Sequence, residues 1–166
     1  MVLRSIWSCY FRRCFLRGPS FLSLTDIHPS NIFVDDEWNI KYFIDLEWAC
    51  SRPVELIHPP YWLNNQGVDS ISLGDYKTLH AEFTEALAEE ELKRSTTSLP
   101  LLYPILQQGW ETGTFWWSLA LNRPTVLFRI FSDHIQPRFS KAHTNGQLFW
   151  VYTMPYWTFN AFDFIQ

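Results

Sequence analysis

The chain has 166 residues, of which 47% are hydrophobic and 18% aromatic, so one domain with a single hydrophobic core is the expected organisation. An apolar content at this level excludes a disordered chain. The formal net charge of −4 and the sequence pI of 5.7 give no basic field, which disfavours binding to nucleic acid.

Residues 1–17 form an atypical basic segment that ends at Gly18-Pro19. The segment has four arginines and no acidic residue, as an organellar presequence would, but it lacks the serine content and the clear cleavage signal of one. We therefore expect a cytoplasmic protein with reduced cysteines, since Cys9, Cys14 and Cys50 match neither a secreted disulfide framework nor a CxxC pair. No apolar run is long enough to predict a membrane span.

Two short β-prone runs follow, Ile32-Phe33-Val34 and Tyr42-Phe43-Ile44, separated by the polar residues 35–39. This spacing predicts a small antiparallel hairpin. Strands of this length need helices to pack against. Residues 51–74 are rich in proline and asparagine and predict an irregular surface connection, of a length that is often functional.

The clearest helix is expected between Asp75 and Arg94, with Asp75 as its N-cap. Apolar residues recur there at helical spacing, and the glutamates between them predict a solvated face, although an acidic middle would also suit a divalent cation. The side chains expected on its buried face are Leu79, Phe83, Ala86, Leu87 and Leu92.

Further helices are expected over residues 99–108 and 110–122, and another from Pro124 through Phe131. Residues 146–166 are aromatic at nearly every second position and leave helix and strand open. Taken together, these elements predict an α+β fold that is mainly α-helical.

Residues 26–45 contain the candidate catalytic and metal-binding side chains. Asp26 is followed five residues later by Asn31, and Asp45 follows the predicted hairpin. Phosphoryl transfer needs a carboxylate beside the acceptor hydroxyl, together with an amide oxygen and a second carboxylate that hold Mg²⁺ against nucleotide phosphates. A short loop and a hairpin bring these three side chains together. In the alternative interpretation, Asp26 and Asn31 are ordinary loop caps.

The same stretch carries a family resemblance. Residues 26–35, DIHPSNIFVD, resemble the catalytic loop of the aminoglycoside phosphotransferase family, and residues 44–49, IDLEWA, resemble its metal-binding motif. The continuation over residues 50–55 and 59–63 is similar to the fungal branch of that family. The resemblance covers residues 18–166 and implies the C-terminal lobe of a protein-kinase-like fold, in which the hairpin carries both motifs.

The resemblance implies roles for individual residues. Asp26 would be the catalytic base, Asn31 and Asp45 would bind Mg²⁺ and with it the phosphates of ATP, and His28 would order the loop. The implied reaction transfers the γ-phosphate of ATP to a hydroxyl of a small-molecule or protein acceptor, whose identity stays open.

Other prominent side chains are expected to be structural. Trp110, Trp116 and Trp117 either supply aromatic walls for the acceptor or, more simply, pack in the core. The remaining histidines, His58, His80, His134 and His143, are expected on the surface or in the core.

Two departures from the family pattern bear on activity. Leu24 stands where a histidine usually precedes the catalytic aspartate, and residues 1–17 provide neither a glycine-rich loop nor a strand lysine for the ATP phosphates. The expected protein is therefore a truncated lobe that is inactive alone, because half of the ATP cleft is missing. An active kinase that completes its site in trans is the second hypothesis. The third is a non-catalytic interaction module that self-associates through the apolar surface uncovered by a missing lobe.

Overall fold

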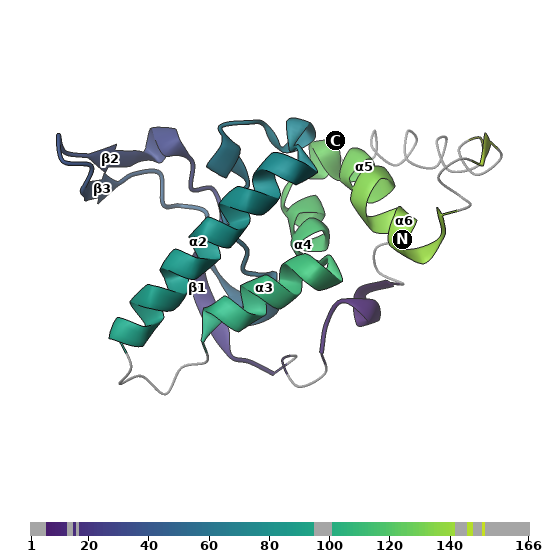
Figure 1. Cartoon of the computed structure of the whole chain (residues 1–166), viewed down its shortest axis with the longest axis horizontal. Helices are drawn as coiled ribbons and strands as arrows, with labels where there is room; N and C mark the ends of the chain where they lie inside the picture. The colour runs from purple at the N-terminus through teal and green to yellow at the C-terminus, as the bar shows by residue number, and fades with distance from the viewer. Residues whose placement is uncertain are drawn as a thin grey trace.

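The computed structural model describes residues 6–12, 15, 17–94, 101–141, 146–147 and 151. The fold is α+β and mainly helical, as predicted: two small antiparallel sheets lie beside a group of packed helices (Figure 1). Within these residues there is no helix with the length and hydropathy of a membrane span.

The first sheet pairs β1 (Ser20–Leu24) with β4 (Ala49–Pro53) in antiparallel register, with Leu24 opposite Ala49. This pairing is absent from the sequence-based expectation, which placed residues 51–74 in an irregular connection. The first three of those residues belong to β4 and the last two begin the helix α2 (Leu73–Lys93). Between them lie three short 3₁₀ turns, η4 (Val54–Leu56), η5 (Tyr61–Asn64) and η6 (Val68–Ser70).

The second sheet is the predicted hairpin, formed by β2 (Ile32–Val34) and β3 (Ile40–Phe43). Ile32 lies opposite Phe43, and the register shifts between Phe33 and Val34. The turn is held by Asp35, whose Oδ1 accepts the N–H groups of Glu37 at 3.1 Å and of Asn39 at 2.8 Å. This tight turn lets β3 begin at Ile40, two residues earlier than expected.

The long helix α2 (Leu73–Lys93) lies close to its predicted position, but Ser72 is its N-cap and Asp75 lies in its first turn. A carboxylate there still complements the positive end of the helix dipole. The prediction of its buried face was partly wrong, because Leu92 is 75% exposed and Ala86 is also exposed. The buried side chains are Tyr76, His80 and Thr84. The exposed glutamates Glu82, Glu85, Glu89 and Glu90 confirm the solvated face.

Two consecutive helices follow, α3 (Leu102–Thr112) and α4 (Thr114–Asn122). The break between them lies at Gly113 and not at residue 109, where it was expected. Gly109 has open space around its Cα and continues α3, whereas Gly113 has a φ of +84° and separates the two helices. A positive φ of this size is readily adopted only by glycine, so the later glycine ends the helix.

The last described helical region begins with the 3₁₀ turn η7 (Pro124–Val126) and extends beyond its predicted end at Phe131. It continues through α5 (Leu127–Ile130), the π-helical turn η8 (Phe131–Ile135) and α6 (Gln136–Phe139). Apart from residues 146, 147 and 151, the aromatic stretch 146–166 lies outside the described residues.

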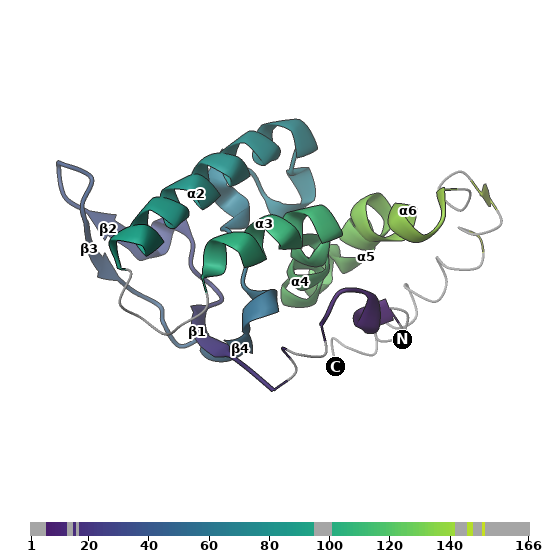
Figure 2. The same cartoon turned by 60° about the horizontal axis from the view of Figure 1, so that its bottom comes forward.

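The core is centred on α4, in which every residue from Thr114 to Ala120 is buried. Trp116 and Trp117 lie in this core, and partly buried Trp110 packs against it, which confirms their structural interpretation. The N-terminal segment belongs to the same core, because Tyr10 is 7% exposed and the ring of Phe11 lies 4.8 Å from that of Trp117. Figure 2 shows this segment running below α4 and α6.

Candidate active site

The loop that follows β1 is anchored at its first residue. The Thr25 hydroxyl donates to the carbonyl oxygen of Trp48 at 2.6 Å, which ties the loop to the segment leading into β4. Further along, His28 is the N-cap of the 3₁₀ turn η3 (Pro29–Asn31), and its Nδ1 accepts the N–H of Ser30 at 3.4 Å. These contacts fit the loop-ordering role expected for His28.

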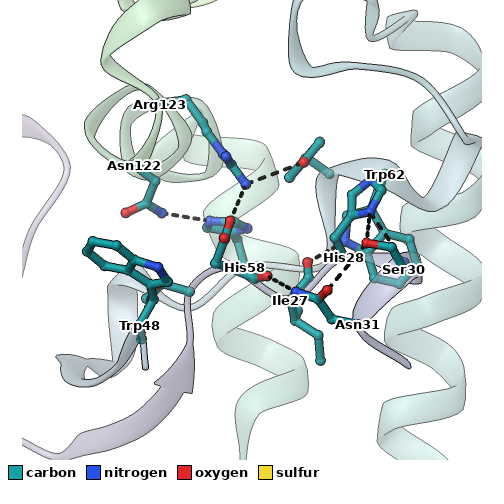
Figure 3. A network of polar contacts seen from close by, with 12 residues as sticks. Ile27, His28, Ser30, Asn31, Trp48, His58, Trp62, Asn122 and Arg123 are labelled. Atoms are coloured by element: carbon teal, nitrogen blue, oxygen red, sulfur yellow. Dashed lines mark hydrogen bonds and ion pairs between the residues drawn. The ribbon is translucent and has the colours of Figure 1, made fainter. Parts of the chain in front are cut away.

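Asn31 connects the loop to the hairpin. Its side-chain Nδ2 donates to the carbonyl oxygen of Asp26 at 3.4 Å, and its Oδ1 accepts from the Ser30 hydroxyl at 3.3 Å. Its carbonyl oxygen accepts the N–H of Ile44 at 3.1 Å. Asn31 therefore contacts both Asp26 and the residue that precedes Asp45. Figure 3 shows Asn31 beside His28 and Ser30.

Asp45 stands at the end of the hairpin in a left-handed conformation, with a φ of +60°. Non-glycine residues rarely adopt this conformation, and such positions cluster at functional sites. Asp26 and Asp45 line the same small pocket, whose cavity volume of about 10 Å³ has room for roughly one water molecule.

A third carboxyl group, that of Glu47, lies at the same place. A hydrogen bond with Asp45 raises the pKa of Glu47, and the negative charges of Asp45 and Asp26 act in the same direction. A neighbouring anion disfavours ionisation of a carboxyl group. The loop and the hairpin thus bring Asp26 and Asp45 to one pocket, with Asn31 hydrogen-bonded to the backbone of Asp26 and of Ile44. Glu47, which lies beside Asp45, is absent from the sequence-based set of site residues.

Arg123 is the main addition to the predicted site. It follows the C-terminal end of α4, and its Nη2 donates to Oδ1 of Asp26 at 3.1 Å and to the hydroxyl of Tyr61 at 3.3 Å. Its guanidinium carbon also lies 5.1 Å from the centre of the Tyr61 ring. Ring and hydroxyl together hold the guanidinium in one orientation toward Asp26.

A second polar network includes Asn122, the residue that precedes Arg123. Arg52 of β4 donates through Nη2 to Oδ1 of Asn122 at 2.8 Å, and Nδ2 of Asn122 lies 3.1 Å from Nε2 of His58. Nδ1 of His58 lies 2.9 Å from the carbonyl oxygen of Pro59, so Nδ1 carries the proton and Nε2 accepts from Asn122. Burial lowers the pKa of His58 to about 4. His58 is therefore a neutral structural residue, as expected.

The donor set of the site suits a hard cation. Asn31 offers an amide oxygen and Asp45 a carboxylate, which are ligand types that Mg²⁺ accepts. The described residues contain no group of three or more His, Cys, Asp or Glu side chains arranged to hold a metal ion. A comparison with known protein families, with curated proteins and with solved structures finds no match to this chain.

Proposed function

We propose that Asp26, Asn31 and Asp45 form the acceptor- and metal-binding half of an ATP-dependent phosphotransferase that resembles the aminoglycoside phosphotransferases. The observation that supports this proposal is the convergence of Asp26 and Asp45 on one pocket, with Asp45 held at a positive φ and Asn31 hydrogen-bonded to the backbone of Asp26 and of Ile44. Phosphoryl transfer depends almost entirely on positioning and on charge stabilisation, so such a convergence is the feature that the reaction requires.

In this proposal Asp26 receives the proton of the acceptor hydroxyl. Its Oδ1 accepts from Arg123, whereas no residue in the described part of the chain hydrogen-bonds to its Oδ2. Oδ2 is thus free to accept a hydrogen bond from the acceptor. Arg123 and Tyr61 fix the direction in which the carboxylate points, and each of these contacts removes rotational freedom from Asp26 before a substrate binds.

Asn31 and Asp45 would hold Mg²⁺, which supplies positive charge against the phosphates of ATP when it is bound. The backbone bond between Ile44 and Asn31 keeps these two ligands near each other. One carboxylate and one amide are few ligands for a divalent cation without nucleotide phosphates, so we expect binding to be weak. In the described residues Arg123 is the cation that contacts Asp26, and further phosphate-binding groups would have to come from elsewhere. We therefore propose that the chain does not transfer phosphate by itself.

Titration with Mg²⁺ followed by NMR tests the site. The amide resonances of Asn31 and Asp45 should shift at millimolar Mg²⁺, and Asp45→Asn should abolish these shifts because it removes the carboxylate. Asp36→Asn, which removes an exposed carboxylate from the hairpin turn, is the matched control and should keep the response. An unchanged spectrum, or equal shifts in Asp45→Asn, would show that the assignment is wrong.

An ATP phosphotransfer assay tests the remaining part of the proposal. We expect no turnover by the purified chain and no difference between wild type and Asp26→Asn. Turnover that is lost in Asp26→Asn would instead support the active kinase that completes its site in trans.

A non-catalytic interaction module is a second candidate function. It is supported by the apolar side chains that β2 and β3 expose, among them Phe33, Tyr42 and Phe43. Exposed apolar patches larger than those of ordinary monomers mark interaction surfaces.

A further inference from the structure

The β2–β3 hairpin projects from the body of the molecule (Figure 1). It forms a sheet of its own with two strands, so β3 pairs with β2 along one edge, and among the described residues no strand pairs with its other edge. All four residues of β3 are exposed. An isolated hairpin of two strands is only marginally stable in water, and an open edge presents unpaired N–H and C=O groups to a further strand.

The outer edge of β3 lacks the features that usually protect an edge strand. The hairpin contains no proline, and its one basic side chain, Lys41, is paired with Asp35 of the same hairpin at 2.8 Å. By contrast, the β1–β4 sheet has Pro19 directly before β1 and Pro53 as the last residue of β4. The edge of β2 is shorter, with three residues, and is interrupted by the register shift. The open edge best suited to pairing is therefore that of β3.

The apolar area of the hairpin is large enough for an interface. The exposed fractions of its large apolar side chains are 48% for Phe33, 42% for Val34, 84% for Trp38, 56% for Ile40, 69% for Tyr42 and 41% for Phe43. At about 200 Å² for each complete side chain, they expose roughly 700 Å² together. A standard interface buries about 800 Å² on each partner. The exposed apolar area is close to this value, and it is divided between the two faces of the hairpin, because neighbouring residues of a strand point to opposite faces.

The charges of the hairpin favour antiparallel over parallel pairing between the β3 strands of two copies. Asp35, Asp36 and Glu37 all lie at the turn, and β3 itself carries Lys41 as its one charged residue. Antiparallel pairing of β3 with the same strand of a second copy places the two acidic turns at opposite ends of the joined strands. Parallel pairing would place them side by side, where like charges repel. A strand edge is also self-complementary in the antiparallel direction, as a two-fold interface requires.

We propose that the outer edge of β3 is a self-association surface on which two copies of this chain pair their β3 strands antiparallel and form one four-stranded sheet. Trp38, Ile40 and Tyr42 supply its apolar contacts. The inference does not depend on the proposed phosphotransfer, because these three residues lie outside the group formed by Asp26, Asn31 and Asp45.

Sedimentation velocity of the full chain from about 1 to about 200 µM tests the proposal over the range in which such an interface associates. The mass should rise from 19.8 kDa and level off at twice that value. Ile40→Lys and Tyr42→Lys each add a second positive charge beside Lys41 on the paired edge of both copies and should weaken dimerisation at least about tenfold. Leu92→Lys replaces a side chain of α2 that is 75% exposed and is the matched control, which should dimerise like wild type.

Hydrogen exchange provides a second measurement that does not rely on a variant. The outward amides of β3 should become more protected as the concentration rises, while those of β1 should not. A wild-type chain that stays monomeric throughout, a mass that rises past the dimer, or equal dimerisation of Ile40→Lys and Tyr42→Lys with wild type would overturn the proposal. Binding of a different protein without dimerisation would also overturn it. The Mg²⁺ response of monomeric Tyr42→Lys then reports on the proposed function separately.

Discussion

Acid should destabilise the folded chain through His58. Burial lowers the pKa of His58 to about 4 in the folded state, the bond to the Pro59 carbonyl opposes this shift, and the charges of Arg52 and Arg123 add to it. In the unfolded chain the ordinary value of 6.5 applies. Between these two values the unfolded state binds a proton that the folded state does not bind.

The size and the sign of this effect follow from proton linkage. A folded-state pKa below the unfolded one gives a histidine whose contribution is fully present above pH 6.5 and is lost as the pH falls toward 4. The free energy of unfolding should fall by about 1.4 kcal/mol for each pH unit in this window, to a total of up to about 3 kcal/mol. Burial also lowers the pKa of His80 and of His134, which adds a loss of the same sign.

Urea unfolding of wild type and of His58→Gln between about pH 7.5 and about pH 4.5 isolates the contribution of His58. Glutamine cannot titrate, yet its side-chain oxygen can still accept from Asn122. Wild type should lose more stability than His58→Gln over this range, by up to about 3 kcal/mol, whatever the difference between them at neutral pH. His28→Gln, at an exposed histidine outside this network, is the control and should behave like wild type. Identical pH dependence of wild type and His58→Gln would refute the reasoning.

Three further predictions concern stability in urea unfolding. Asp45→Gly should be about 1 kcal/mol more stable than Asp45→Ala, because a φ of +60° strains a residue that has a Cβ, and equal stabilities would contradict this. Gly113→Ala should cost about 1–2 kcal/mol or more, since its Cβ would lie 2.6 Å from the Arg138 side chain at a positive φ. The control Gly109→Ala, in open space within α3, should instead stabilise by up to about 1 kcal/mol. Tyr10→Phe should leave stability unchanged or raise it by up to about 1 kcal/mol, because no described group hydrogen-bonds to its buried hydroxyl; a clear loss would indicate a partner.

The parts of the fold that could be predicted have local signals. The hairpin and α2 follow from alternation and helical spacing within a few residues, and both lie within two or three residues of their expected bounds. The β1–β4 pair could not be found in this way, because β4 reads Ala-Cys-Ser-Arg-Pro and shows no alternation of apolar and polar residues. Its partner lies more than twenty residues away, across the whole hairpin. The predicted break between α3 and α4 was wrong because either of two glycines, Gly109 and Gly113, could end a helix. Only the backbone geometry, with a positive φ at Gly113, shows which of them does.

The candidate site likewise has one part that the sequence could predict and one part that it could not. Asp26, Asn31 and Asp45 lie within twenty residues of one another, so a spacing argument could group them, although their catalytic roles stay predictions. Arg123 is separated from Asp26 by 97 residues and reaches it because α4 crosses the core. No motif surrounds Arg123, and its position next to Pro124 at the end of a helix gave no sign of a contact with the loop.

The burial of α4 from Thr114 to Ala120 has a consequence for how the molecule opens. Its residues contact the N-terminal segment through Tyr10, η4 through the carbonyl oxygen of Leu56, and η8 through the ring of His134, which stacks on Trp116 at 3.6 Å. Elements from early and late parts of the chain cover the same short helix, α4. Detaching any one of them therefore exposes the same buried side chains of α4 to water. Local opening at either end is therefore coupled to global unfolding, and the amide protons of α4 should exchange only when the whole domain unfolds.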